Sequence, residues 1–123
     1  MGIERGTIPT AKGKNIVKLR SIQLLVSDNG GIIMGKGRME ILASIDRTGS
    51  INKTAKALKM SYKSVWSKIK STEANFGRPV VTATKTEGTH LTEEGRTLLD
   101  QYKRLNEQCI ETDDAHFRAI FKA

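Results

Sequence analysis

The sequence has little of several residue types, and each shortage excludes a class of protein. One cysteine among 123 residues cannot form an internal disulfide, so nothing indicates a disulfide-stapled secreted domain. No apolar run approaches the ~18 residues of a membrane-spanning helix, and the N-terminal residues lack the apolar core of a signal peptide. We therefore expect a cytoplasmic protein without membrane contact. Aromatic residues make up 5% of the chain, so aliphatic side chains must fill a modest core.

Acidic residues are almost missing from the centre of the chain. The net charge is +8, and residues 47–85 contain nine Lys or Arg side chains but a single acid, Glu73. Residues 86–123 contain eight acidic and five basic residues. A solubilising surface would mix the two signs, so this concentration favours a polyanionic partner such as nucleic acid.

The first third of the chain predicts strands. Residues 1–15 are rich in Gly, Lys and Thr, and we interpret them as a flexible tail. Residues 16–26 alternate in hydrophobicity, with a slip near Ser21 that is typical of a bulge. The turn residues at 27–31 and the short apolar run at 32–34 complete a β-hairpin.

The middle of the chain predicts three helices. Apolar residues at 39–45 recur with helical spacing, and Gly49 can end that helix in a left-handed conformation. Ser50 can cap a second helix. A break at residues 59–60 follows, and Ser61 can cap a third helix, whose apolar positions recur every three or four residues.

The last part predicts two more strands and a long helix. Residues 80–84 and 89–91 have the pattern of a hairpin, and Thr92 can cap the helix that follows. In that helix, four side chains recur at heptad steps and predict a seam with a second copy: Leu98, Tyr102, Leu105 and Cys109.

Two short helices separated by about three residues, followed by a β-hairpin, are typical of a winged helix-turn-helix. We therefore predict an α+β winged helix-turn-helix fold with an N-terminal β-hairpin and a long C-terminal dimerisation helix. We expect residues 16–91 to form the DNA-binding domain and residues 92–123 the dimerisation segment. Double-stranded DNA and a second copy of the chain are the expected partners.

The third predicted helix has the two faces that DNA reading requires. Apolar side chains occupy one face, while Lys and Ser side chains without an acid occupy much of the other. Ser50 and Lys53, near the start of the second helix, suit phosphate contacts. We predict these DNA-binding residues: Ser50, Lys53, Ser61, Tyr62, Lys63, Ser64, Ser67, Lys68 and Lys85.

Several motifs, in this order and spacing, resemble a known family. They are GKGR at 35–38, TGSI at 48–51, MSYKSVW at 60–66, FGRPVV at 76–81 and LTEEGR at 91–96. Together they resemble the N-terminal DNA-binding domain of the molybdate-responsive ModE regulators, and the winged helix of LysR-type regulators is a more distant relative. The resemblance implies a homodimer on a palindromic operator, paired through the long C-terminal helix with help from the N-terminal region.

The chain departs from the family at three places. The family's wing is longer and richer in glycine than residues 85–89, and Thr54-Ala55 stands where an alanine pair is usual. The usual turn glycine is Lys59, which would cost on the order of 1 kcal/mol at positive φ. Only residues 96–123 follow Gly95, so we expect no molybdate-binding domain in this chain.

Other chemistry has weaker support. Cys109, Asp113 and His116 are spaced so that a helix brings them together, and two chains could share a metal there, but a heptad seam with polar positions is the preferred interpretation. One Cys and two distant His build no activated nucleophile, so we predict no enzyme activity, no cofactor and no metal. A winged helix that binds an acidic protein, or a regulator that senses a metal or oxyanion at its dimer interface, remain alternatives. The sequence does not name an effector.

Overall fold

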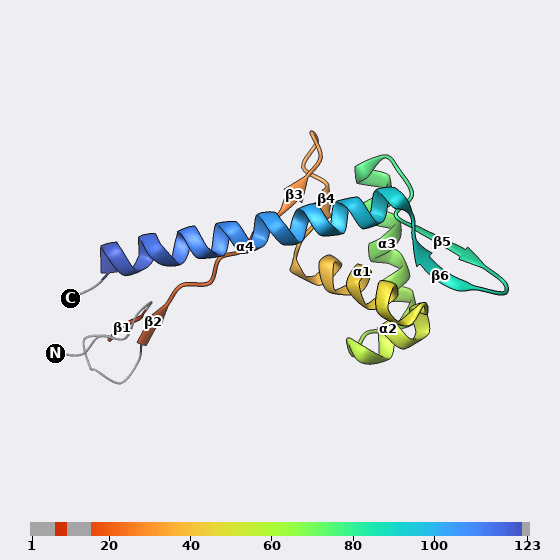
Figure 1. Ribbon diagram of the computed structural model, residues 1–123, viewed down its shortest axis with the longest axis horizontal. Coiled ribbons are helices and arrows are strands. Elements are labelled where there is room, and N and C mark those ends of the chain that lie inside the picture. The colour runs from red at the N-terminus through yellow and green to blue at the C-terminus, as the bar shows by residue number, and fades with distance from the viewer. Residues whose placement is uncertain (1–6, 10–15, 122–123) are drawn as a thin grey trace. The chain divides into compact units, whose positions relative to one another are not determined.

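The computed structural model describes residues 7–9 and 16–121 (Figure 1). The chain forms two compact units. The central unit comprises Gln23–Arg104, and the terminal unit comprises Met1–Ile22 with Leu105–Ala123. Helix α4 (Glu93–Phe121) contributes its first turns to the central unit and its last turns to the terminal unit.

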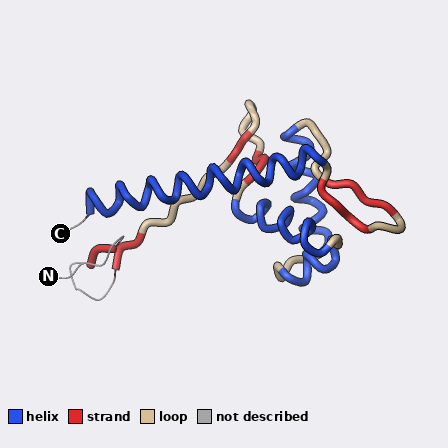
Figure 2. Tube along the Cα trace, viewed as in Figure 1, coloured by secondary structure: helices blue, strands red, loops and turns tan. Residues whose placement is uncertain are grey.

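The central unit is an α+β winged helix-turn-helix, which confirms the predicted fold class (Figure 2). Strands β3 and β4 pair antiparallel and precede helices α1, α2 and α3 in the chain. Strands β5 and β6, which follow α3, also pair antiparallel. We call the hairpin of β5 and β6 the wing. The elements before α4 are β3 (Leu25–Val26), β4 (Ile32–Met34), α1 (Lys36–Thr48), α2 (Ile51–Ala57), α3 (Tyr62–Phe76), β5 (Val81–Thr84) and β6 (Gly88–Leu91).

Aliphatic side chains from several elements form the core of the central unit. Ile41 and Ile45 of α1, and Val65 and Ile69 of α3, are buried. The spacing of these residues by four places them on one face of each helix, so each helix buries an apolar stripe against the others. The expected aliphatic core is therefore present.

The largest fully buried side chain comes from α4. Tyr102 is 1% exposed, and its hydroxyl donates a hydrogen bond to the Gln23 carbonyl oxygen at 2.7 Å. Leu98, one turn earlier, belongs to the same core. Two side chains of the predicted seam thus pack in the chain's own core, and the seam itself stays a prediction. Leu105 is 40% exposed and Cys109 is half-buried.

The helices begin where the cap residues predicted. The Ser50 hydroxyl accepts the N–H of Lys53, and the Ser61 hydroxyl accepts the N–H of Ser64, both at 3.0 Å. These bonds satisfy donors that the first helical turn leaves free. Gly49 adopts the predicted left-handed conformation at the end of α1.

The LTEEGR motif joins the wing to α4. The Thr92 hydroxyl accepts the Gly95 N–H at 2.9 Å and donates to the Pro79 carbonyl oxygen at 2.8 Å. A side chain at Gly95 would place its Cβ 2.1 Å from the Val80 carbonyl oxygen. Glycine is therefore required there by the close approach of two backbones.

The N-terminal strand differs from the prediction. Instead of one strand over residues 16–26, β2 (Ile16–Lys18) and β3 are separate, and the irregularity in the β3–β4 pair lies between Leu25 and Val26 rather than near Ser21. The physical reason is the length of the partner strand. Strand β4 has three residues, so it can pair with only a short stretch of residues 16–26.

Strand β2 has its own partner in the terminal unit. It pairs antiparallel with β1 (Thr7–Pro9), a segment that the sequence placed in the tail. The rest of the predicted tail, residues 1–6 and 10–15, lies outside the described residues. Among residues 7–9 and 16–121, no helix is long and apolar enough to cross a membrane.

Candidate nucleic-acid interface

Helices α2 and α3 are joined by a tight turn. Lys59 adopts φ 56°, and the Met60 N–H donates to the Ala55 carbonyl oxygen at 2.9 Å. Lys59 therefore takes a left-handed conformation, which is costly for a residue with a Cβ. Beneath the turn, the buried Thr54 hydroxyl donates to the Ser44 hydroxyl at 2.9 Å and ties α2 to α1.

Helix α3 presents a polar face to solvent. Its buried residues are Val65, Ile69 and Thr72, and none of the predicted contacts is among them. Because no acidic side chain lies among those contacts, this face suits an anionic partner. The exposed members are Ser61, Tyr62, Lys63, Ser67 and Lys68, and Ser64 is half-buried.

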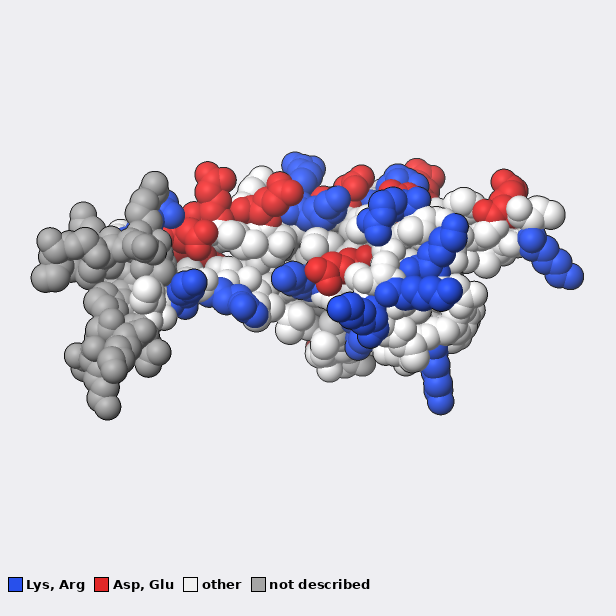
Figure 3. All heavy atoms as spheres, turned by 90° about the horizontal axis from the view of Figure 1, so that it is seen from below, with Lys and Arg blue, Asp and Glu red and all other residues white. Residues whose placement is uncertain are grey.

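The other predicted contacts come from α2 and the wing. Lys53 is exposed on α2, Ser50 is half-buried at its cap, and Lys85 is exposed in the wing turn. The Thr89 N–H of β6 donates to the Gly49 carbonyl oxygen at 3.0 Å, which ties the wing to the start of α2. Figure 3 shows basic side chains projecting from this part of the chain on one face of the molecule.

Arg38 holds α3 in place, a role that the sequence did not reveal. Its guanidinium donates to the Lys68 carbonyl oxygen at 3.2 Å and to the Thr72 hydroxyl at 3.0 Å. The Thr72 hydroxyl in turn donates to the Ile33 carbonyl oxygen at 2.9 Å. Partial burial lowers the pKa of the Arg38 guanidinium below its usual value. Helix α1 and strand β4 thus fix the middle of α3.

Glu73 fixes the start of the wing to α3. One carboxylate oxygen accepts the N–H groups of Val80 at 2.9 Å and Val81 at 3.3 Å, and the other lies 3.2 Å from the Lys70 ammonium. Charge-assisted bonds to backbone N–H groups are stronger than neutral ones. The sequence could have indicated a special role for Glu73, because it is the one acidic residue in residues 47–85.

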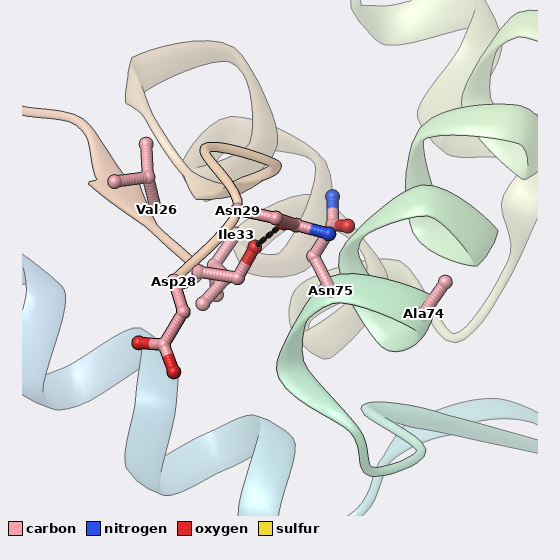
Figure 4. A pocket seen from close by; sticks show the side chains of 7 residues that line it. Val26, Asp28, Asn29, Ile33, Ala74 and Asn75 are labelled. Atoms are coloured by element: carbon pink, nitrogen blue, oxygen red, sulfur yellow. Dashed lines mark hydrogen bonds between the residues drawn. The ribbon is translucent and has the colours of Figure 1, made fainter.

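An open pocket of about 500 Å³ lies between the β3–β4 turn and the end of α3 (Figure 4). The Ser27 hydroxyl donates to the Asn29 side-chain oxygen at 2.5 Å, and the Asn75 side-chain amide donates to the Ile32 carbonyl oxygen at 2.8 Å. The chain itself thus occupies several of the polar groups in this region. The pocket is lined by Val26, Ser27, Asp28, Asn29, Ile33, Ala74 and Asn75.

The three residues weighed as an alternative metal site, Cys109, Asp113 and His116, lie on α4. Within residues 7–9 and 16–121, no group of three His, Cys, Asp or Glu side chains is placed to hold a metal ion. Asp113, one member of the trio, accepts a hydrogen bond from the Ser21 hydroxyl at 2.8 Å.

These observations define a winged helix-turn-helix protein whose second motif helix exposes a basic, acid-free face. Residues 37–96 match the family described as "Bacterial regulatory helix-turn-helix protein, lysR family". Residues 37–96 are therefore similar to the helix-turn-helix region of LysR-type regulators. The matched family is one of regulatory proteins, which agrees with the prediction of no enzyme activity for this region.

Two curated relatives agree with the resemblance seen in the motifs. The chain is 39% identical over 59 residues to the molybdenum-pterin-binding protein MopB of Rhodobacter capsulatus, covering 48% of this chain. It is 33% identical over 79 residues to the molybdenum transport protein ModE of Azotobacter vinelandii, covering 61% of this chain. The matched region spans only 22% and 29% of the lengths of these relatives, so the relation to them is distant and partial.

Solved structures share the fold. A chain of the CbnR_DBD–DNA complex matches with a TM-score of 0.60 and 21% identity, covering 70% of this chain and 98% of that one. CbnR, a LysR family transcriptional regulator, matches with a TM-score of 0.57 and 20% identity, covering 68% of this chain and 28% of that one. At these identities the likeness establishes the architecture of the chain.

Proposed function

We propose that this chain is a transcriptional regulator that binds double-stranded DNA through α3 and works in the cytoplasm. The observation that carries the proposal is the exposed face of α3, with Lys63 and Lys68 beside serine hydroxyls and without an acid. A helix of this kind fits the major groove, where lysine can donate to guanine acceptors. The match to a LysR-type domain and the fold shared with the CbnR_DBD–DNA complex support it.

The remaining predicted contacts extend this surface. Lys53 and the capped start of α2 suit phosphates on one side of α3, and Lys85 in the wing turn suits phosphates on the other. The proposed DNA-binding domain spans residues 16–91, and the proposed dimerisation segment spans residues 92–123. This division by proposed role differs from the division into compact units, because the central unit includes α4 as far as Arg104.

The finer proposal is a regulator of the ModE type, a homodimer on a palindromic operator with a link to molybdate or oxyanion metabolism. It is supported by the two molybdenum-related relatives and by the motif order. Two recognition helices would enter major grooves about 34 Å apart, or a multiple of that distance. No residue of the chain is assigned to an effector, and a separate chain could supply the sensor.

A binding selection tests the proposal. Duplexes enriched from a random 30-base-pair pool are labelled, and fluorescence anisotropy measures affinity from 50 to 200 mM salt. We expect enrichment of one motif and a steep loss of affinity with salt, because lysine–phosphate contacts release counterions. Failure to enrich a motif, with weak and salt-insensitive binding, would contradict the proposal and favour a protein-interaction module.

Lys63→Ala refines the test. If Lys63 reads a base, the variant binds the motif about tenfold more weakly and relaxes the preference at one position. An equal loss on all sequences would make Lys63 a phosphate contact instead. Molybdate or tungstate that leaves operator affinity unchanged would contradict oxyanion sensing by this chain.

A further inference from the structure

Trp66 is an exposed aromatic residue on α3 that is not among the DNA contacts proposed above, and we call its side of the helix the aromatic flank. Its side chain is 39% exposed, and Tyr62, one turn earlier, is 50% exposed. One turn later, the Lys70 ammonium lies 4.4 Å from the centroid of the indole ring. The Lys70 ammonium therefore covers one face of an exposed indole, which lies beside the polar face that carries Lys63.

A chain of contacts holds this flank beside the start of the wing. The Lys70 ammonium, besides stacking on the indole, lies 3.2 Å from one Glu73 carboxylate oxygen. The other oxygen of Glu73 accepts backbone N–H groups where β5 begins. The indole therefore occupies a defined position on α3, on the same side of the helix as the base of the wing.

The position of the flank decides which part of a duplex it would meet. When a recognition helix enters the major groove, the centre of its exposed face approaches base edges, and its sides approach the sugars and phosphates of the groove wall. Trp66 is three residues from Lys63 and lies between the buried stripe and the polar face. It is thus placed toward a wall of the groove.

We propose that Trp66 is a further DNA contact, which binds the sugar–phosphate backbone rather than a base. The ring packs on a deoxyribose, and the indole N–H donates to a phosphate oxygen, with the Lys70 ammonium adding positive charge beside it. Within the described part of the chain, the indole N–H makes no hydrogen bond that would compete. This inference rests on the proposed DNA binding and adds a contact to it.

Intrinsic fluorescence gives a direct test, because Trp66 is the single tryptophan of the chain. The full-length wild-type protein is titrated with a duplex enriched from the random pool, and anisotropy of the labelled duplex reports binding independently. We expect quenching of Trp66 by iodide and by acrylamide to fall as the duplex saturates. Unchanged quenching at saturation would overturn the inference and leave DNA binding intact, whereas no anisotropy change would overturn both.

A substitution identifies the partner of the N–H group. Trp66→Phe keeps a ring beside Lys70 and removes the donor, so we expect about tenfold weaker binding on every duplex, the cost of one bond to a charged group. Phe121→Leu, a change to an exposed aromatic side chain near the end of α4, is the control and should leave affinity unchanged. Circular dichroism melting checks that both variants are folded.

Neutral methylphosphonates, placed one at a time along the duplex, complete the cycle. At the contacted phosphate, the neutral group should weaken DNA binding by the wild-type protein about tenfold and should hardly change binding by the Trp66→Phe variant. Equal losses for both proteins at every phosphate would overturn the proposed bond. A second result would also overturn it. If Trp66→Phe binds more weakly than the wild-type protein on a thymine duplex but equally well on a uracil duplex, the partner of Trp66 is a thymine methyl group.

Discussion

At the scale of single residues, Lys59 shows a strained conformation that the sequence anticipated. Its φ of 56° places a side chain in the left-handed region, where any residue with a Cβ is disfavoured. Lys59→Gly should therefore raise the free energy of unfolding by up to about 1 kcal/mol, after the entropy that glycine adds to the unfolded chain. Urea unfolding monitored by circular dichroism measures the change.

Lys56→Gly supplies the matched control for that prediction. It removes the same charge from α2, where the backbone is helical, and should lower the free energy of unfolding by about 1 kcal/mol. If both variants are destabilised alike, the turn conformation is not a source of strain.

Tyr102 makes stability depend on alkaline pH. Burial raises the pKa of its phenol above the ordinary value, so folding favours the protonated form. The stability that results is fully present below the unfolded pKa of about 10 and is lost as pH rises through the higher folded value. We expect thermal melts to show a fall in wild-type stability above about pH 10.

Tyr102→Phe tests the origin of this pH dependence. The variant loses the bond to the Gln23 carbonyl oxygen, which should cost about 1 kcal/mol at neutral pH, and it should lose most of the alkaline slope. Tyr62→Phe, at the exposed phenol, should keep that slope. A slope unchanged in Tyr102→Phe would assign the alkaline loss to other groups.

At the scale of elements, the start of α3 combines a structural and a binding role. Ser61→Asp keeps a side-chain acceptor at the cap and suits the helix dipole, so stability should hold or rise slightly. Because it puts a negative charge at the proposed interface, DNA affinity should fall about tenfold or more. Ser61→Ala should instead lower stability by about 1 kcal/mol. Melting curves and anisotropy separate the two effects.

An acidic residue placed elsewhere is the control for Ser61→Asp. Thr97→Asp adds the same charge at an exposed position of α4, away from the proposed contacts, and should change affinity far less. Equal losses in the two variants would mean that the total charge matters and that the cap position does not.

The elements of the helix-turn-helix were predictable because their signals are local. Ser50 and Ser61 cap helices through bonds to residues three positions later, and Gly49 ends α1 through its own backbone. Such short-range chemistry is written in consecutive residues. The exposed face of α3 was predictable for the same reason, since helical periodicity separates it from the buried stripe.

What the sequence could not predict depends on distant partners. Arg38 reaches the Lys68 carbonyl oxygen 30 positions away, and neither residue marks the other in the sequence. The split between β2 and β3 depends on pairing with β1 and with the short β4. Heptad spacing in α4 identified an apolar stripe, but the spacing alone does not say whether a residue such as Tyr102 packs within one chain or between two.

At the scale of the whole molecule, the proposed homodimer now depends on a smaller part of α4. Leu98 and Tyr102 belong to the central core, so the predicted seam is left with Leu105 and Cys109. Cys109 is the one cysteine of the chain, and any disulfide it forms with itself must join two copies. Such a bond requires the two Cα atoms to approach within roughly 4.4–6.8 Å, so mild oxidation reports whether the helices meet at this position.

The face of α4 that carries Leu105 and Cys109 can be distinguished from the other exposed apolar positions of the helix by substitution. Leu105→Glu introduces a charge where the two helices would meet, so sedimentation velocity should show the dimer dissociating to monomer, and operator affinity should fall because only one recognition helix is then bound. Ile110→Glu makes the same kind of change at a similarly exposed residue on another face of α4, and it should leave the dimer intact. If Ile110→Glu dissociates the dimer and Leu105→Glu does not, the copies pair through a different face, and the cross-link through Cys109 should then fail as well.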